Sequence, residues 1–231
     1  MDFDFAVIAD NLTYFLMGRY PNGPVGGVLL TLWLAFASII LSSMGGLFLG
    51  LSSLSQRKMI SVPSELVIQT LRGVPLLMVI FWMYFLMPAL FGKGFPETGT
   101  VIAALSLFTS AYMSQIVRAG IQSVPNGQWE AGRSSGLTDH QVMFYIVLPQ
   151  ALRNMIPSFV NQFVSLIKDT SLAFIVGVSE LSHVATQINN RTLTSPTEIF
   201  LFIAVVYFIM CYLFTSLSRY LENRFSWKVA I

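Results

Sequence analysis

The sequence predicts an all-helical integral membrane protein with five transmembrane helices. Hydrophobic residues make up 55% of its 231 residues, whereas Asp, Glu, Lys and Arg together make up 10%. Soluble domains carry about 25% charged residues, so this chain has too few charged side chains to cover the surface of a soluble fold. Its apolar residues are gathered into long segments, and such segments can cross the roughly 30 Å hydrocarbon core of a bilayer. A multi-pass membrane domain is therefore the expected fold class.

The chain begins with a mixed segment that ends at a strong helix breaker. Residues 1–24 combine Phe, Leu and Ile with Asp residues and Arg19, which is typical of an interfacial helix. The same Asp residues, with no basic region ahead of an apolar core, argue against a cleavable signal peptide. Tyr20-Pro21-Asn22-Gly23-Pro24 then breaks the helix. We expect an N-terminal segment over 1–24 on the periplasmic side, a transmembrane domain over 25–220 and a cytoplasmic tail over 221–231.

Five apolar segments follow the breaker, and each is expected to cross the membrane. The first contains no charged residue, and Ser42, Gly46 and Gly50 recur on one of its helix faces. Small residues at this spacing let two helices approach closely. The second segment follows residues 61–73, which we expect to form a helix at the membrane surface. The five expected spans are 25–54, 74–91, 101–117, 155–178 and 199–217.

The distribution of basic residues predicts that the N-terminus lies outside the cell and the C-terminus inside. In this orientation the inner segments carry nine of the thirteen Lys and Arg residues, whereas the outer segments carry Arg19, Lys93 and Arg191. Positively charged residues favour the cytoplasmic side of a membrane. The same orientation places residues 118–153 in the cytoplasm.

A polar stretch over residues 126–149 interrupts the apolar chain within that cytoplasmic region. Pro125-Asn126-Gly127 is a turn signal, and residues 128–135 can then form about two turns of helix. Gly136 lies where the end of a helix favours a residue with positive φ. The stretch therefore predicts a first short helix that ends at a corner.

A second short helix is expected after the corner. Thr138 and Gln141 have the spacing of a capping box, which predicts a helix start. Pro149 is expected to break or kink this second helix near its end.

The same stretch resembles the EAA loop of ABC importer permeases. The resemblance rests on Glu130-Ala131-Gly132, then Gly136, and after nine residues Ile146-Val147-Leu148-Pro149. It implies a cytoplasmic loop whose short helix docks into a groove of an ATP-binding subunit. Gly132 stands where Ala is usual, which lowers the local helix propensity by up to about 1 kcal/mol. The residues thereby implicated in coupling to an ATPase are Glu130, Ala131, Gly132, Arg133, Gly136, Leu148 and Pro149.

Two alternatives remain open for this loop. It can instead be an ordinary amphipathic loop of another kind of membrane protein. Arg133 can pair with an acidic residue of the ATPase, or it can be a solvated charge of the cytoplasmic side.

The fourth expected span contains two adjacent charged residues, Lys168 and Asp169, followed by Thr170 and Ser171. An ionisable side chain at the centre of a bilayer costs about 2.5–3.5 kcal/mol on insertion scales, so such residues usually pair, face a cavity or line a pathway. Adjacent residues point about 100° apart on a helix. Lys168 and Asp169 are therefore poorly placed to pair with each other, and we expect at least one to face a polar cavity or a partner subunit.

Lys-Asp-Thr-Ser at this place resembles the polar amino acid branch of the ABC permeases, whose substrate path lies here. Under that resemblance Lys168 suits the α-carboxylate of an amino acid, Asp169 suits its α-ammonium group, and Thr170 and Ser171 belong to the same path. The alternative is a structural pair of charges that fastens this helix to a neighbour.

Two further segments resemble the same branch. Arg72-Gly73-Val74-Pro75-Leu76 occurs at the entry to the second span, and residues 112–120 correspond to the end of the third. Arg72 and Arg118 would lie at the inner membrane interface, where we favour surface anchoring over substrate contact. The resemblance covers about residues 25–220.

The resemblance implies a permease subunit of an ATP-driven, binding-protein-dependent amino acid importer in the bacterial inner membrane. The sequence contains no phosphate loop of the form G-x-x-x-x-G-K-[ST] and no His/Cys cluster with metal-ligand spacing. The chain is therefore expected to bind no cofactor, while ATP and Mg²⁺ belong to a partner ATPase. The implied partners are an ATPase dimer, a second permease subunit that is identical or paralogous, and a periplasmic or lipid-anchored amino acid binding protein. No nucleic acid partner is expected.

The sequence does not decide which amino acid is transported. Lys168 adds positive charge to the path, which favours glutamate or aspartate slightly. The alternative class is a self-contained secondary carrier or a multi-pass membrane enzyme. A carrier would show repeats or broken helices in matching halves, and an enzyme would show a catalytic cluster at membrane depth. Neither pattern is visible in the sequence.

Overall fold

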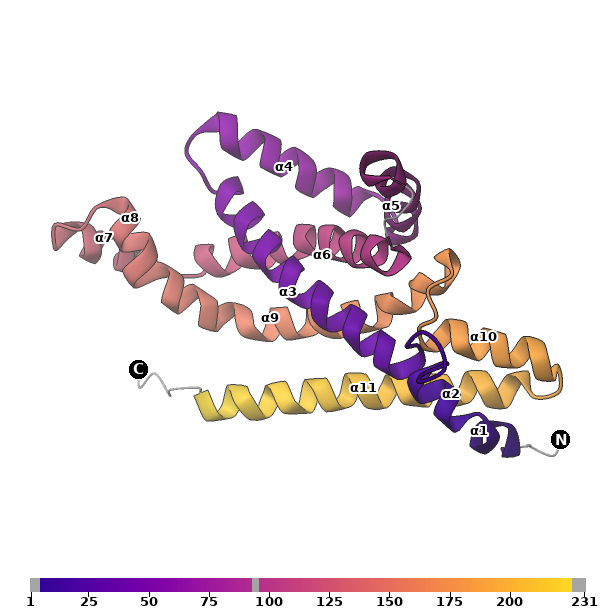
Figure 1. Ribbon diagram of the computed structural model, residues 1–231. Helices are drawn as coiled ribbons and strands as arrows, with labels where there is room; N and C mark the ends of the chain where they lie inside the picture. The colour runs from indigo at the N-terminus through magenta and orange to yellow at the C-terminus, as the bar shows by residue number, and fades with distance from the viewer. Residues whose placement is uncertain (1–4, 93–95, 226–231) are drawn as a thin grey trace. The chain divides into compact units, whose positions relative to one another are not determined.

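Every regular element that the computed structural model describes is a helix (Figure 1). The described residues are 5–92 and 96–225. They fall into two compact units, each assembled from segments that are far apart in the sequence. Unit 1 consists of Met1–Ile40, Pro75–Leu105 and Phe163–Ile231, and unit 2 consists of Leu41–Val74 and Ser106–Gln162. The predicted all-helical fold class is confirmed.

Four helical segments are long and apolar enough to cross a membrane. They are α3 (Gly27–Ser53), α6 (Glu97–Gln122), the helical run Asp139–Val176, and α11 (Pro196–Phe225). A bent pair of helices, α4 (Lys58–Gly73) and α5 (Leu76–Phe91), supplies a fifth crossing if the pair counts as one span. The described residues thus contain four or five candidate spans, in agreement with the five that the sequence predicts.

The helical break between α4 and α5 follows from a proline at the junction. Val74 is extended, with φ −111° and ψ 142°, as is usual for a residue that precedes proline. Pro75 is extended as well, and α5 starts at the next residue. The helix expected over 61–73 is therefore found as α4, and its place at the membrane surface stays a prediction.

Helices also form at both ends of the described part of the chain. Two short helices, α1 (Ala6–Asp10) and α2 (Leu12–Met17), occupy the N-terminal segment. At the other end, α11 runs past residue 220, and residues 226–231 of the expected tail lie outside the described residues. The expected domain boundaries at residues 24 and 220 stay predictions.

Unit 1 has an apolar core that joins α2, α10 (Leu181–Thr192) and α11. Its fully buried members are Phe15, Leu181, Val184, Ala185, Ile188, Ile199 and Ile203. The four members on α10 follow the i, i+3, i+4, i+7 spacing of an amphipathic helix. We did not expect this helix from the sequence, because it lies between two long apolar segments and is polar on its other face.

Within unit 2, α3 and α6 pack closely along the small-residue face of α3. A Cβ atom added to Gly46 would lie 2.5 Å from the Cβ of Met113, and one added to Gly50 would lie 2.7 Å from the Cβ of Val117. Both distances are shorter than real Cβ contacts, so only glycine permits this approach. The predicted use of Gly46 and Gly50 for close helix packing is confirmed.

Candidate coupling loop and translocation path

The polar stretch in mid-chain folds into the expected corner, within unit 2. Helix α7 (Asn126–Ser134) begins directly after Pro125. Gly136 has φ +82°, and its backbone N–H donates to the Arg133 carbonyl at 2.9 Å. The following N–H, of Leu137, donates to the Gly132 carbonyl at 3.2 Å. These two bonds satisfy carbonyl groups at the end of α7, so the predicted role of Gly136 as a positive-φ corner is confirmed.

The second helix of the loop begins with the expected capping box. The Gln141 backbone N–H donates to Thr138 Oγ1 at 3.4 Å, and the Thr138 backbone N–H donates to Gln141 Oε1 at 2.8 Å. Helix α8 (Asp139–Val142) starts at the next residue. This reciprocal pair fixes the direction in which the chain leaves the corner.

The expected break at Pro149 is not present. The chain passes from α8 into one π-helical turn, η1 (Met143–Val147), and then directly into α9 (Leu148–Asp169). Pro149 lies inside this continuous helical run, directly after the π turn, and has no backbone N–H to contribute to the helical hydrogen-bond ladder. The irregularity therefore takes the form of a π turn ahead of the proline, and such turns are frequent at functional sites.

Gly132 is the buried residue of α7. A Cβ atom added to it would lie 2.8 Å from Val142 Cγ2 and 3.0 Å from Ile146 Cδ1. Helix α7 thus rests against the α8–η1 segment through a contact that leaves no room for a methyl group. The departure from the usual Ala at this motif position is explained by the bulky side chains that face it in this chain.

The outer surface of α7 is open. Glu130 and Ala131 are exposed, and no hydrogen bond or ion pair of the Glu130 carboxylate is found within the part of the chain that the structure describes. Arg133 Nε donates to Asp139 Oδ1 at 2.8 Å, with side chains 56% and 59% exposed. An exposed pair of this kind contributes at most about 1 kcal/mol. Arg133 therefore has a partner inside the loop in this structure.

The loop is fastened to the helices on either side of it by one apolar cluster. Its buried members come from α6, the turn after α6, α8, η1 and α9, and they are Val117, Ile121, Val124, Val142, Val147, Ala151 and Met155. Trp129 and Leu137 of the loop pack against them, while Leu148 is half-buried and Pro149 is exposed. The loop and the facing parts of α6 and α9 therefore share one apolar core.

The two arginines expected at the inner interface lie within unit 2. Arg118 of α6 contacts α4, and Arg72 of α4 contacts α6. Arg118 Nη1 donates to Glu65 Oε2 at 3.2 Å, with both side chains about one-third exposed. The guanidinium carbon of Arg72 lies 5.5 Å from the centre of the Tyr112 ring, which is a cation–π distance. These contacts hold α4 against α6, a role that the sequence analysis did not anticipate. Anchoring at the membrane surface stays a prediction.

The charged residues of the fourth span lie in unit 1, at a change of helix type. Asp169 ends α9, and a 3₁₀ helix of seven residues, η2 (Thr170–Val176), follows. Short 3₁₀ turns are frequent at the ends of α-helices, but runs longer than three or four residues are uncommon. The sequence pattern over these residues does not predict this change of helix type.

The polar side chains at this junction differ in exposure. Lys168 is exposed, Asp169 and Ser171 are half-buried, and Thr170 is fully buried. The Thr170 hydroxyl donates to the Ile167 carbonyl at 2.7 Å. No ion pair joins Lys168 to Asp169 within the described residues. The opposite face of α9 is apolar and packs through Leu166, Ile167, Ala35, Met210, Cys211 and Phe214.

A buried carboxyl group that the sequence analysis missed caps α10. Glu180 accepts hydrogen bonds from the backbone N–H groups of Ser182 at 2.8 Å and His183 at 2.9 Å, and from the Tyr207 hydroxyl at 2.9 Å. Burial raises the pKa of Glu180 from 4.5 to about 7, against the opposing effect of these hydrogen bonds. The sequence signal that could have identified this cap is a Glu directly before an amphipathic helical pattern.

Comparison with known proteins assigns the chain to a family. The family described as "Binding-protein-dependent transport system inner membrane component" matches residues 42–227. The chain belongs to this family. The permease is 42% identical over 200 residues to the "Probable glutamine ABC transporter permease protein GlnP" of Bacillus subtilis, covering 86% of this chain and 91% of that protein. It is 31% identical over 230 residues to the "Glutamate/aspartate import permease protein GltK" of Escherichia coli, covering 96% and 98%.

Solved structures agree with this assignment. The permease matches a chain of an amino acid ABC transporter crystallised with histidines, with a TM-score of 0.84, 32% identity, and coverage of 97% of this chain and 100% of the other. It shares the fold of the MetNI methionine ABC transporter, with a TM-score of 0.74 and 19% identity. The permease is therefore a multi-pass inner-membrane subunit of a polar amino acid ABC importer. In this class a separate ATPase hydrolyses ATP, and a binding protein is a partner.

Proposed function

We propose that the permease forms half of the path of the importer and that a second permease subunit, identical or paralogous, forms the other half. Two ATPase subunits bind ATP and Mg²⁺ on the cytoplasmic side, and a periplasmic or lipid-anchored binding protein delivers a polar amino acid to the outer side. The lack of a phosphate loop in the sequence supports the assignment of ATP hydrolysis to the partner. The excess of Lys and Arg in the inner segments supports the orientation with the N-terminus outside.

The exposed surface of α7 is the proposed contact with the ATPase. Glu130 offers a carboxylate with no partner among the described residues, and Ala131 beside it leaves room for close approach. Gly132 and Gly136 give the loop its shape, while Arg133, Leu148 and Pro149 flank the contact. Since the loop shares its core with α6 and α9, closure of the ATPase would move both helices together.

The proposed substrate contacts lie at the junction of α9 and η2. The observation that carries this proposal is the exposure of Lys168, inside a candidate membrane span, beside a half-buried Asp169, with no ion pair between them among the described residues. An amino acid brings a carboxylate for Lys168 and an ammonium group for Asp169, so both charges gain a partner when substrate is bound. Thr170 and Ser171 follow in the 3₁₀ segment, where a change of helix type can open or close the path.

The names of the relatives, rather than the charges of Lys168 and Asp169, limit which amino acids we propose as substrates. Glutamine, cystine and glutamate or aspartate are the compounds named for relatives that are 31–42% identical to this chain. Because any α-amino acid carries both a carboxylate and an ammonium group, we propose that Lys168 and Asp169 recognise this common part. The preference of Lys168 for an acidic amino acid is then an additional, smaller effect.

Uptake into proteoliposomes tests the path. The permease is reconstituted with its ATPase and binding protein, and uptake of radiolabelled glutamine, glutamate, aspartate and cystine is measured. Lys168→Met and Asp169→Asn should each reduce uptake at least tenfold while the variants still co-purify with the ATPase. Arg219→Met, which removes a basic side chain from α11, is the matched control and should transport normally. Normal uptake with either path variant would favour the alternative in which the two charges only fasten helices.

A further inference from the structure

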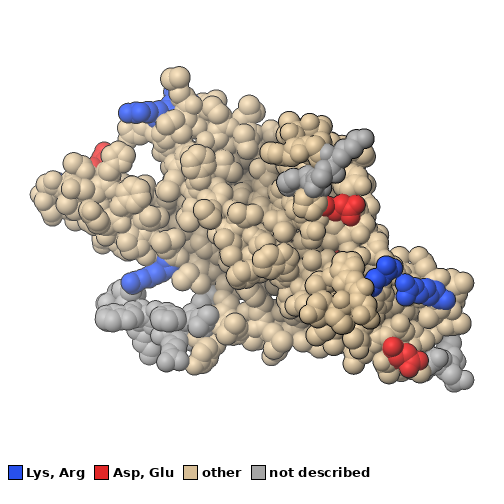
Figure 2. Space-filling view, in the orientation of Figure 1, with Lys and Arg blue, Asp and Glu red and all other residues tan. Residues whose placement is uncertain are grey.

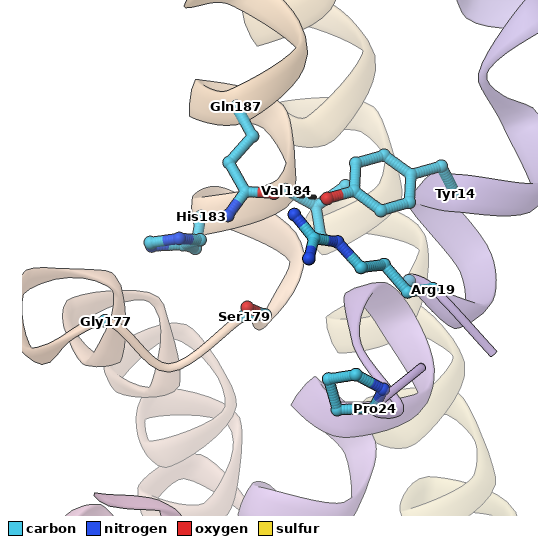
Figure 3. A pocket seen from close by; sticks show the side chains of 9 residues that line it. Tyr14, Arg19, Pro24, Gly177, Ser179, His183, Val184 and Gln187 are labelled. Carbon is cyan, nitrogen blue, oxygen red and sulfur yellow. Dashed lines mark hydrogen bonds between the residues drawn. The ribbon is translucent and has the colours of Figure 1, made fainter. Parts of the chain in front are cut away.

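Unit 1 contains a cavity of about 160 Å³ whose wall is largely polar (Figure 3). It lies between the end of α2, the turn after it, and the first half of α10. Along the sequence, one candidate membrane span, Asp139–Val176, lies between the expected cytoplasmic corner at Gly136 and the cavity residues that start at Gly177. In the proposed orientation the cavity therefore opens on the external side. Its polar lining residues are Tyr14, Arg19, Ser179, His183 and Gln187.

Most polar groups of this cavity already have a partner. The Tyr14 hydroxyl donates to Gln187 Oε1, and the guanidinium carbon of Arg191 lies 5.4 Å from the centre of the Tyr14 ring. His183 Nδ1 faces the Phe174 carbonyl oxygen at 3.3 Å. These contacts fix the shape of the cavity before any ligand enters.

Arg19 is the exception. Its side chain reaches from the turn toward the Tyr14–Gln187 pair (Figure 3), and no hydrogen bond or ion pair of Arg19 is found among the residues that the structure describes. A guanidinium group carries five N–H donors in a fixed plane and cannot act as an acceptor. Its strongest partner is a carboxylate that approaches in that plane and accepts two bonds.

The size of the cavity limits what can enter. Sites for whole small molecules are usually about 300–1,000 Å³, so 160 Å³ suits the end of a side chain better than a complete solute. Basic side chains also lie over α10 in the view of Figure 2. Among the described residues, the acidic residues of the surrounding segments are Asp10, Glu97 and the fully buried Glu180, and none of these three pairs with Arg19.

We propose that this cavity receives an Asp or Glu side chain of the external amino acid binding protein, whose carboxylate pairs with Arg19. This inference rests on the proposed function, because it takes that binding protein as the partner. Gly177 and Ser179 in the cavity wall connect η2 to α10, and the Ser179 carbonyl accepts a hydrogen bond from the Gly27 N–H at 2.9 Å. A docked side chain thus contacts the segment that directly follows the proposed substrate path.

The test uses the permease–ATPase complex in lipid nanodiscs with its purified binding protein. The concentration of binding protein that gives half-maximal stimulation of ATP hydrolysis is measured, together with the Kd for fluorescently labelled binding protein. Arg19→Glu should raise both values about tenfold or more, since like charges then meet across the contact. Arg19→Gln should raise them less, and ATP hydrolysis without binding protein should be unchanged in both variants. Arg219→Gln removes the same charge from an exposed residue of α11 that does not line the cavity and should leave both values unchanged.

Several outcomes separate this proposal from its competitors. Recovery of binding to Arg19→Glu by an Asp→Arg or Glu→Arg variant of the binding protein would support it. Unchanged binding to Arg19→Glu, with normal stimulation of the wild type, would overturn the cavity proposal alone. Lack of stimulation of the wild type by binding protein would remove the proposed function and this inference together. An Arg19 effect seen only in nanodiscs with anionic phosphatidylglycerol, or with millimolar free glutamine and no binding protein, would assign Arg19 to a lipid phosphate or to free substrate and overturn it as well.

Discussion

The hydroxyl group of Tyr207 donates a hydrogen bond to the carboxyl group of Glu180 at 2.9 Å, which joins α11 to the first turn of α10. Glu180 is fully buried, and the Ser182 hydroxyl lies 3.3 Å from the same Tyr207 oxygen. Because Glu180 also caps α10 through two backbone N–H groups, one carboxyl group holds together the start of one helix and the middle of another. The packing of the unit 1 core depends on this polar contact.

Replacement of Tyr207 by Phe should destabilise the permease. The change leaves a buried carboxyl group short of one donor, which costs about 1–3 kcal/mol. For a chain of this length that corresponds to a decrease of roughly 2–12 °C in apparent unfolding temperature, measured in detergent by thermal denaturation. Tyr212→Phe, which changes an exposed tyrosine stacked on Phe208, is the control and should change the temperature little. Equal stability of the two variants would contradict a structural role for the Tyr207–Glu180 bond.

Stability should also depend on pH through Glu180. Its pKa is raised by burial from 4.5 to about 7, so the folded state holds a proton that the unfolded chain releases at lower pH. The stability gained from this proton is fully present below about pH 4.5 and is lost as the pH rises through about 7. We expect the unfolding temperature of the wild type to fall between pH 5 and 8 more steeply than that of Glu180→Gln. Parallel curves for the two proteins would show that Glu180 does not titrate in this range.

Gly132→Ala tests the buried contact of the coupling loop. The added methyl group would overlap Val142 Cγ2, and overpacking of this kind costs about 1–3 kcal/mol. The gain in helix propensity, up to about 1 kcal/mol, does not offset this cost. We expect lower uptake per ATP hydrolysed, with recovery when Val142→Ala makes room. Gly127→Ala is the control, because a Cβ atom there meets nothing within 4 Å.

Gly136→Ala should impair coupling through the backbone rather than through packing. Gly136 has φ +82° and open space around its Cα, so the substitution adds roughly 1 kcal/mol of backbone strain without a steric clash. Gly92 has φ +85° and is equally open but lies outside the loop, so Gly92→Ala introduces the same kind of strain elsewhere. Loss of ATP-driven uptake in the first variant only would locate the effect in the loop. Gly136→Pro, which requires a φ near −65°, should abolish uptake while membrane insertion is retained.

Glu130→Lys tests the exposed face of α7. The substitution reverses a charge that has no partner among the described residues, so the fold of the permease should be unchanged. If Glu130 contacts a basic group of the ATPase, co-purification of the ATPase should decrease about tenfold or more. Ser134→Lys adds a positive charge to an exposed residue of the same helix and controls for charge alone. Normal assembly and uptake in Glu130→Lys would argue against a coupling role for this residue.

The corner of the coupling loop could be predicted because its signals are local. Gly136 supplies the positive φ, and Thr138 with Gln141 forms a capping box within four residues. These features depend on backbone geometry that a short stretch of sequence determines by itself. The long apolar helices were predictable for a similar reason, since length and hydropathy alone identify a span.

The features that the sequence did not reveal depend on contacts between distant segments. The apolar face of α10 is buried against Phe15, which lies 166 residues before the first residue of the helix, and Ile203, which lies 11 residues after its last. Glu180 is buried because Tyr207 supplies a donor from another helix. Pro149 was expected to break or kink a helix, but the helical run continues through it behind the π turn Met143–Val147, and the sequence around the proline gives no signal for that turn.

The seven residues of η2 give the outer end of the fourth span an adjustable length. A 3₁₀ helix rises about 2.0 Å per residue with three residues per turn, whereas an α-helix rises about 1.5 Å with 3.6. Rewinding this segment as α-helix would shorten it by about 3.5 Å and rotate its far end by about 140°. Such a screw-like movement would draw Gly177 and the base of the outer cavity toward Asp169 without bending any rigid helix.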